Sequence, residues 1–134
     1  MPDPQPTQSR LIRDFEDLLS WQEARALHIA VCQACRSSTW KHRWGLSDQI
    51  KDAAVSVMAN LAEGFERGWP GTFHQFVCYA KGSCGEVRSH ITAALSEGLI
   101  TPEVAATLRL QCQRTEALIG GLRKSAAARA KHIE

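Results

Sequence analysis

The apolar residues of this chain recur mostly at intervals of three and four, the spacing that gathers them on one side of an α-helix. This spacing predicts helices near residues 20–38, 47–67, 72–98 and 101–123. The apolar positions are Trp21, Ala24, Leu27, His28, Val31 and Cys35; Ile50, Ala54, Val57, Leu61 and Phe65; Phe73, Phe76, Val77, Ala80, Cys84, Val87, Ile91 and Ala94; and Val104, Leu108, Cys112, Thr115, Ile119 and Leu122.

Residues typical of helix ends flank these segments. The expected first residues or N-caps are Ser20, Ser47, Thr72 and Thr101. Ser20 and Thr72 are followed three residues later by Glu or Gln, the spacing of a capping box. Thr101 is followed by proline, which suits the first helical position. The clearest interruption is Gly68–Gly71, and Gly98 stands where a C-terminal cap belongs.

Four amphipathic helices joined by one medium and two short connections predict an all-α fold, an antiparallel up-down-up-down four-helix bundle. We expect the bundle to occupy residues 15–124. Residues 1–14 contain three prolines and are expected to form a flexible arm. Residues 125–134 are rich in Ala, Lys and Arg, and we expect this basic tail to fray.

Composition restricts the class of protein. The chain has 134 residues, of which 44% are hydrophobic and 22% charged, as in ordinary globular domains. The net charge is +2, but residues 109–134 carry six Lys or Arg against two acids. No run approaches the roughly 20 apolar residues that cross a bilayer. The five cysteines have no disulfide-framework spacing, so we expect a cytoplasmic protein with free thiols.

Polar residues of the second and third predicted helices form one candidate site. Glu63 and Arg67 are an i,i+4 pair, and Glu86 could meet Arg67 from the facing helix. We favour a structural or interface network, whose residues are Asn60, Glu63, Arg67, Gly82, Ser83 and Glu86. If the carboxylates are poorly solvated, removing Arg67 should cost on the order of 3 kcal/mol. Gly82 and Gly85 lower helix stability, which predicts close approach of another helix or subunit.

His28, Cys32 and Cys35 share one helix face and could supply soft metal ligands. Because the thiols fall on the apolar stripe, we favour core packing and expect no metal and no cofactor. The sequence offers no nucleophile beside a base, so we expect neither catalytic residues nor a small-molecule substrate. The protein is predicted not to be an enzyme.

Cations alternate with aromatic residues between the first two predicted helices, as in proteins that stack bases beside neutralised phosphates. The candidate nucleic-acid contacts are Trp40, Lys41, Arg43, Trp44, Arg123, Lys124, Arg129 and Lys131. The alternative is that the two tryptophans close the bundle end or line a subunit interface.

Three motifs carry a family resemblance: Asn60–Arg67, Phe73–Ala80 and Gly82–Glu86, read as NLAEGFER, FHQFVCYA and GSCGE. With the opening Phe15–Leu18 and Trp21–Ala24, they resemble the four-helix-bundle family of 23S rRNA intervening-sequence proteins over residues 15–122. Proteins of similar fold are accessory proteins of retroelement reverse transcriptases, and they form pentamers with a basic surface that contacts nucleic acid.

The resemblance and the basic residues together suggest a non-enzymatic oligomeric scaffold, a pentamer by resemblance, that binds structured RNA, DNA or an RNA-bearing complex. The alternative is a homo-oligomeric protein-interaction adaptor with no nucleic-acid role. Neither hypothesis calls for contact with a membrane.

Overall fold

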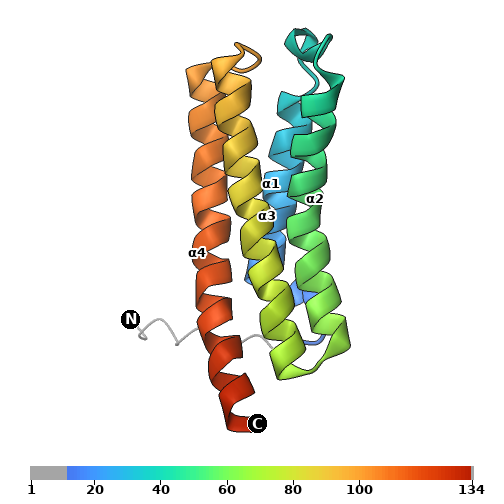
Figure 1. Cartoon of the computed structure of the whole chain (residues 1–134), viewed down its shortest axis with the longest axis vertical. Helices are drawn as coiled ribbons and strands as arrows, with labels where there is room; N and C mark the ends of the chain where they lie inside the picture. Colours follow the sequence, from blue (N-terminus) through green and yellow to red (C-terminus); the bar gives the residue numbers. More distant parts are fainter. Residues whose placement is uncertain (1–11, 134) are drawn as a thin grey trace, which may run out of the picture.

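The computed structural model describes residues 12–133, with side chains through residue 128. Most of the expected arm, residues 1–14, lies outside this range. In chain order the elements are the 3-10 turn η1 (Phe15–Asp17), α1 (Leu19–Ala34), the 3-10 turn η2 (Ser38–Trp40), α2 (Trp44–Arg67), α3 (Pro70–Ser96) and α4 (Pro102–Ile133). The chain is an all-helical four-helix bundle, as predicted (Figure 1).

The helices run alternately up and down, and each connection lies at the opposite end from the one before (Figure 1). Each helix packs on its neighbours in sequence, and α1 also packs on α4, which closes the bundle. Among the described residues, no helix combines the length and apolar character needed to cross a membrane.

The predicted apolar stripes meet in one core cluster. Its largest fully buried side chains include Trp40, Leu27, Ile50, Leu61, Ile91 and Ile119. Three polar residues are buried among the described residues, Ser20, Ser47 and Thr115. The Thr115 hydroxyl donates to the Gln111 carbonyl at 2.9 Å and lies 3.3 Å from the Glu23 carbonyl. Gln111 also donates to the Glu23 carboxylate at 2.6 Å. These bonds join α4 to α1. They also satisfy the Thr115 hydroxyl, which would destabilise the fold if it were buried without a partner.

Only one of the four expected N-caps has this role. The Thr101 hydroxyl accepts a hydrogen bond from the Val104 amide at 3.2 Å and caps α4, as predicted. Ser20 and Ser47 lie inside α1 and α2 and are buried, so these two predictions are wrong. Thr72 was also wrong, because α3 begins at Pro70. Proline at the first position lacks the amide hydrogen that a cap would otherwise satisfy.

Two helices end at the glycines that were predicted to end them. Gly68 ends α2 with φ +77°, and Gly98 follows α3 with φ +74°. Both angles lie in the left-handed region that glycine adopts without steric cost. The predicted end near Arg123 was wrong, since α4 continues to Ile133. Ala, Lys and Arg are strong helix formers, which explains the continuation.

Two helices approach each other closely at a glycine for which no such role was predicted. A Cβ atom placed on Gly64 of α2 would lie 2.7 Å from the Phe76 Cβ of α3. By contrast, a Cβ on Gly82 would meet nothing within 4 Å, and one on Gly85 only Arg88 of the same helix, at 3.9 Å. Close packing of another helix of the chain on Gly82 and Gly85 was therefore a wrong prediction.

We expect Gly64→Ala to lower the free energy of unfolding by about 1–3 kcal/mol, because α2 and α3 must separate or repack. Gly121→Ala is the matched control, since a Cβ there meets nothing within 4 Å. It should raise stability by up to about 1 kcal/mol through helix propensity. Urea unfolding of the two variants checks both signs. Equal effects would contradict a close contact at Gly64.

Candidate nucleic-acid interface

The two tryptophans of the α1–α2 connection lie in opposite environments. Trp40 ends η2 with 1% of its surface exposed and belongs to the core cluster. Its indole nitrogen is buried without a hydrogen-bond partner among the described residues. Trp44 begins α2 and is 63% exposed. Base stacking on Trp40 was therefore a wrong prediction, because the indole closes the end of the bundle and cannot reach a ligand.

The connection also has fewer free cations than its sequence indicates. Arg43 donates to both carboxylate oxygens of Glu97, at 2.6 and 3.1 Å, and so ties the start of α2 to the end of α3. Hydrogen bonding from Arg43 lowers the pKa of Glu97. Lys41 remains exposed and makes no ion pair among the described residues. Arg43 is thus largely neutralised by its own chain.

The connection and the basic end of α4 are far apart in one chain. They lie at opposite ends of the bundle (Figure 1). The 22 residues from Pro102 to Arg123 span about 30 Å along the helix axis. Arg123 is half-buried and Lys124 exposed, while the side chains of Arg129 and Lys131 lie outside the described residues. These two groups of predicted contacts do not form one surface within a protomer.

The residues of the predicted structural network do not form one connected group. Arg67 donates to Glu63 at 2.8 Å, with both side chains about half exposed (55% and 51%), and its guanidinium lies 5.1 Å from the Phe76 ring centre. Glu86 is exposed and forms no pair with Arg67. An exposed pair of this kind contributes about 0–1 kcal/mol. The expected cost of 3 kcal/mol for losing Arg67 was therefore too high.

Asn60 and Ser83 are linked indirectly, because both bond to Ser56, which was not predicted as part of the network. The Asn60 amide donates to the Ser56 carbonyl and hydroxyl at 2.9 and 3.0 Å. The Ser83 hydroxyl donates to the same Ser56 hydroxyl at 3.0 Å. The bond between Ser83 and Ser56 joins α3 to α2 and helps to fix the axial position of one helix against the other. The half-buried cluster contains no titratable group.

Two of the five cysteines lie in the core as predicted, whereas Cys32, Cys35 and Cys78 are only partly buried. Cys84 and Cys112 are buried, and burial raises the pKa of each thiol to about 12. His28 Nε2 lies 3.4 Å from Cys32 Sγ within α1. Over the described residues, no group of three or more His, Cys, Asp or Glu side chains could hold a metal ion.

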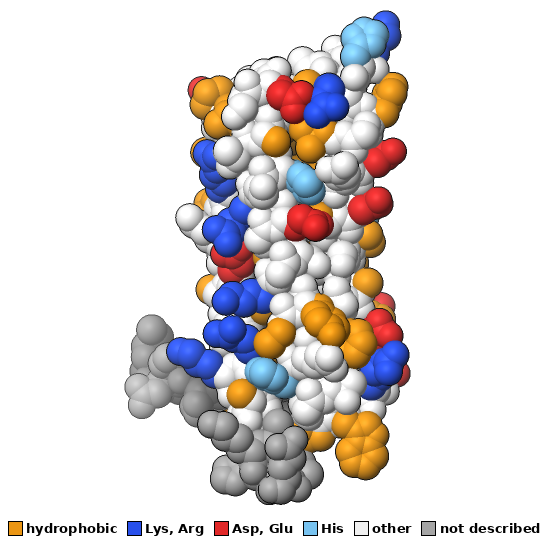
Figure 2. Space-filling view, in the orientation of Figure 1, with side chains coloured by type: hydrophobic (Ala, Val, Ile, Leu, Met, Phe, Trp, Pro, Cys, Tyr) orange, Lys and Arg blue, Asp and Glu red, His pale blue; other side chains and the backbone are white. Residues whose placement is uncertain are grey.

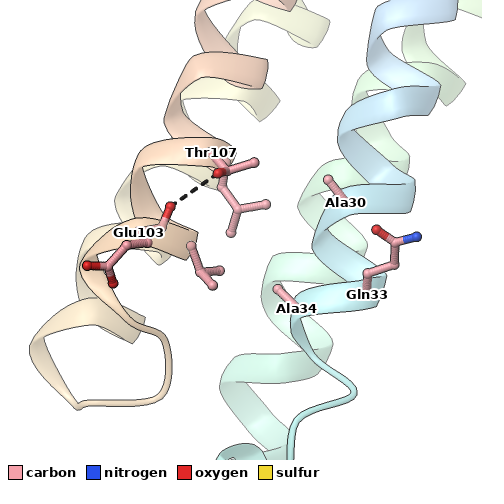
Figure 3. Close-up of a pocket in the computed structure, with 7 residues that line it drawn as sticks. Ala30, Gln33, Ala34, Glu103 and Thr107 are labelled. Atoms are coloured by element: carbon pink, nitrogen blue, oxygen red, sulfur yellow. Dashed lines mark hydrogen bonds between the residues drawn. The ribbon is translucent and has the colours of Figure 1, made fainter.

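A groove of about 390 Å³ lies between α1 and α4 (Figure 3). It is lined by Ala30, Gln33, Ala34, Glu103, Val104, Thr107 and Leu108. The Thr107 hydroxyl bonds the Glu103 carbonyl of its own helix at 3.1 Å, and Glu103 is the one carboxylate of the lining. The groove therefore offers an apolar floor with little chemistry.

A row of basic side chains follows the seam between α3 and α4. We call it the basic row: Lys81 and Arg88 of α3, and Arg109 and Arg123 of α4. Arg88 pairs with Glu116 at 2.6 Å, and Arg109 donates to the Thr92 hydroxyl at 3.2 Å. With α3 and α4 antiparallel in this register, Lys81 lies level with Arg123. Figure 2 shows Lys and Arg side chains following one another along the α4 side of the molecule.

Three of the four cations of this row, Lys81, Arg88 and Arg109, were not predicted as contacts. Lys81 and Arg88 are seven residues apart, and Arg109, Glu116 and Arg123 repeat at the same interval. Seven residues are nearly two helical turns, so each set lies on one helix face. That repeat was the available signal. Only the register of α3 against α4 joins the two faces into one surface, which carries a charge of +3 with Glu116 included.

The fold defines a helical-bundle protein with a basic seam between α3 and α4. Residues 16–121 match the family model described as 23S rRNA-intervening sequence protein. The chain therefore belongs to this family, as the sequence motifs indicated. No curated protein matches the chain.

We expect Trp40→Ala to lower the free energy of unfolding by about 3–5 kcal/mol, because it removes a fully buried aromatic side chain. Trp44→Ala is the control at an exposed position and should change stability by less than about 0.5 kcal/mol. Thermal or urea unfolding measures both. A stable Trp40→Ala variant would contradict the buried position of this indole.

Proposed function

We propose that this protein is a non-enzymatic, cytoplasmic, homo-oligomeric scaffold that binds structured RNA through the basic row. The observation that carries this proposal is the alignment of four cations against one acid along the α3–α4 seam. Lys81 and Arg123 have no ion-pair partner among the described residues and remain available for phosphates.

The row suits a phosphate backbone better than a base edge. Arg109 and Arg123 are separated by 14 residues, or about 21 Å along the helix axis. Cations spread over such a length neutralise several phosphates and release counterions. This contribution to binding does not depend on the nucleotide sequence. The row contains no aromatic side chain, so it supplies no stacking platform of its own. These features favour the backbone of a folded or duplex RNA.

Oligomerisation would give a chain with a net charge of only +2 a useful affinity. Each protomer would add a basic row to the same assembly, and linked contacts bind more tightly than isolated ones. Gly82 lies on the exposed side of α3 with open space around it, which permits close approach of a neighbouring subunit. The pentamer is the state that the family resemblance suggests.

A protein-interaction adaptor is the second candidate. It is favoured by exposed apolar side chains, of which Trp69, Trp44 and Leu19 are the most exposed, at 72%, 63% and 57%. The α1–α4 groove would add an apolar floor for a partner. Dependence of RNA binding on the basic row separates the two candidates.

We expect the double variant Lys81→Gln/Arg123→Gln to bind a duplex RNA hairpin more weakly than the parent protein. The magnitude of the log–log salt slope should fall by about 1.5 for each bound protomer, since two phosphate contacts are lost. Fluorescence anisotropy at several salt concentrations measures both quantities.

The matched control is Lys51→Gln/Arg67→Gln, which removes the same charge from α2. It should leave the salt slope unchanged. Equal losses in both double variants would reject a localised row. No binding by the parent oligomer at about 50 mM salt would reject the RNA function and favour the adaptor.

Self-association is tested by light scattering at micromolar concentration. One chain is 14.8 kDa, so a pentamer would have five times this mass, about 74 kDa. We expect a single species whose mass corresponds to several chains, because several basic rows can act together only in an assembly of protomers. A mass of one chain would contradict the scaffold proposal.

A further inference from the structure

Among the described residues, Trp69 is the most exposed large hydrophobic side chain, although its backbone is tightly constrained. It lies between α2 and α3, and 72% of its surface is exposed. Gly68 precedes it with φ +77°, and Pro70 follows it at the first position of α3. Proline restricts the residue before it to extended conformations, as the Trp69 angles of −80° and 131° reflect.

The backbone of Trp69 is also held by a hydrogen bond. The Phe73 amide donates to the Trp69 carbonyl at 2.7 Å, which anchors the residue to the first turn of α3. Because the backbone is already fixed, only side-chain freedom is lost when a ligand covers this residue. The large exposed ring is therefore carried on a rigid backbone.

One end of the basic row, formed by Lys81 and Arg123, faces this end of the bundle. Lys81 lies eleven residues after Pro70 on α3, about 16 Å along the helix axis, and Arg123 is level with it. Lys124 is exposed one residue further along α4, which runs down toward the same end (Figure 1). A strand that leaves the row in this direction runs toward the α2–α3 connection, which carries Trp69.

Trp44 is equally large and nearly as exposed, but its surroundings are different. It lies at the opposite end of the bundle, where Glu97 neutralises Arg43. Asp48 pairs with Lys51 there at 3.8 Å, while Glu103 and Lys41 are exposed and opposite in charge. At the Trp69 end, Glu63 is paired with Arg67, and Glu66 is an exposed acid next to this pair. An uncharged nucleobase is not repelled by the Glu66 carboxylate, whereas the negatively charged phosphates are attracted to the basic row.

We propose that Trp69 stacks on an unpaired base next to a duplex segment of RNA that lies on the basic row. This inference rests on the proposed RNA-binding function and specifies the ligand as a junction between paired and unpaired RNA. The row attracts the phosphates of the paired segment, and the indole face covers one base of the unpaired segment. Stacking tolerates any base, so the preference is for strand structure and not for sequence.

The test compares two RNAs that share one duplex, one blunt and one with a short unpaired 3′ or 5′ extension. The parent oligomer should bind the extended RNA more tightly than the blunt RNA. Trp69→Ala should weaken binding of the extended RNA on the order of 5- to 150-fold and leave the blunt RNA unchanged. Trp69→Phe should retain part of the preference, because a smaller ring still stacks.

Trp44→Ala is the matched control and should leave both affinities unchanged. Light scattering of each variant checks that the assembly is intact. If Trp69→Ala dissociated the oligomer, the side chain would belong to a subunit contact and the inference would be wrong. It would also be wrong if the parent bound both RNAs equally, although the RNA function would then stand. If neither RNA bound, the function itself would fail.

Discussion

The axial register of α2, α3 and α4 is the constraint on which the rest of the structure depends. Two residues join α2 to α3, and five join α3 to α4, so the helices cannot slide past one another. The contacts across the first seam agree with this register, from Ser56 with Ser83 to Gly64 with Phe76. The same constraint pairs Arg88 with Glu116 across the second seam and aligns the basic row.

The sequence predicted the elements that depend on one helix at a time. Apolar residues such as Leu27, Ile91 and Ile119 follow the helical period because each helix has one buried face. Gly68 and Gly98 were predictable as ends because only glycine adopts their backbone angles without strain. These signals are local and need no knowledge of neighbouring helices.

Features that depend on tertiary position could not be predicted in this way. Ser20 and Ser47 have the chemistry of caps, but burial inside the bundle decided where they lie. Trp40 and Trp44 are four residues apart with similar neighbours, and only the turn at η2 separates a core residue from an exposed one. Gly64 has no local signal that distinguishes it from Gly82, because its partner Phe76 lies on another helix.

The two-residue connection between α2 and α3 also determines where the chain tolerates changes in length. One inserted residue would turn a following helix by about 100° and move its apolar face away from the core. With only Gly68 and Trp69 available, the α2–α3 connection has no slack to absorb such a rotation. The nine residues between α1 and α2 have that slack. We therefore expect the nine-residue connection before α2 to tolerate insertions and deletions better than the α2–α3 connection, and the hairpin of α2 and α3 to require a fixed length.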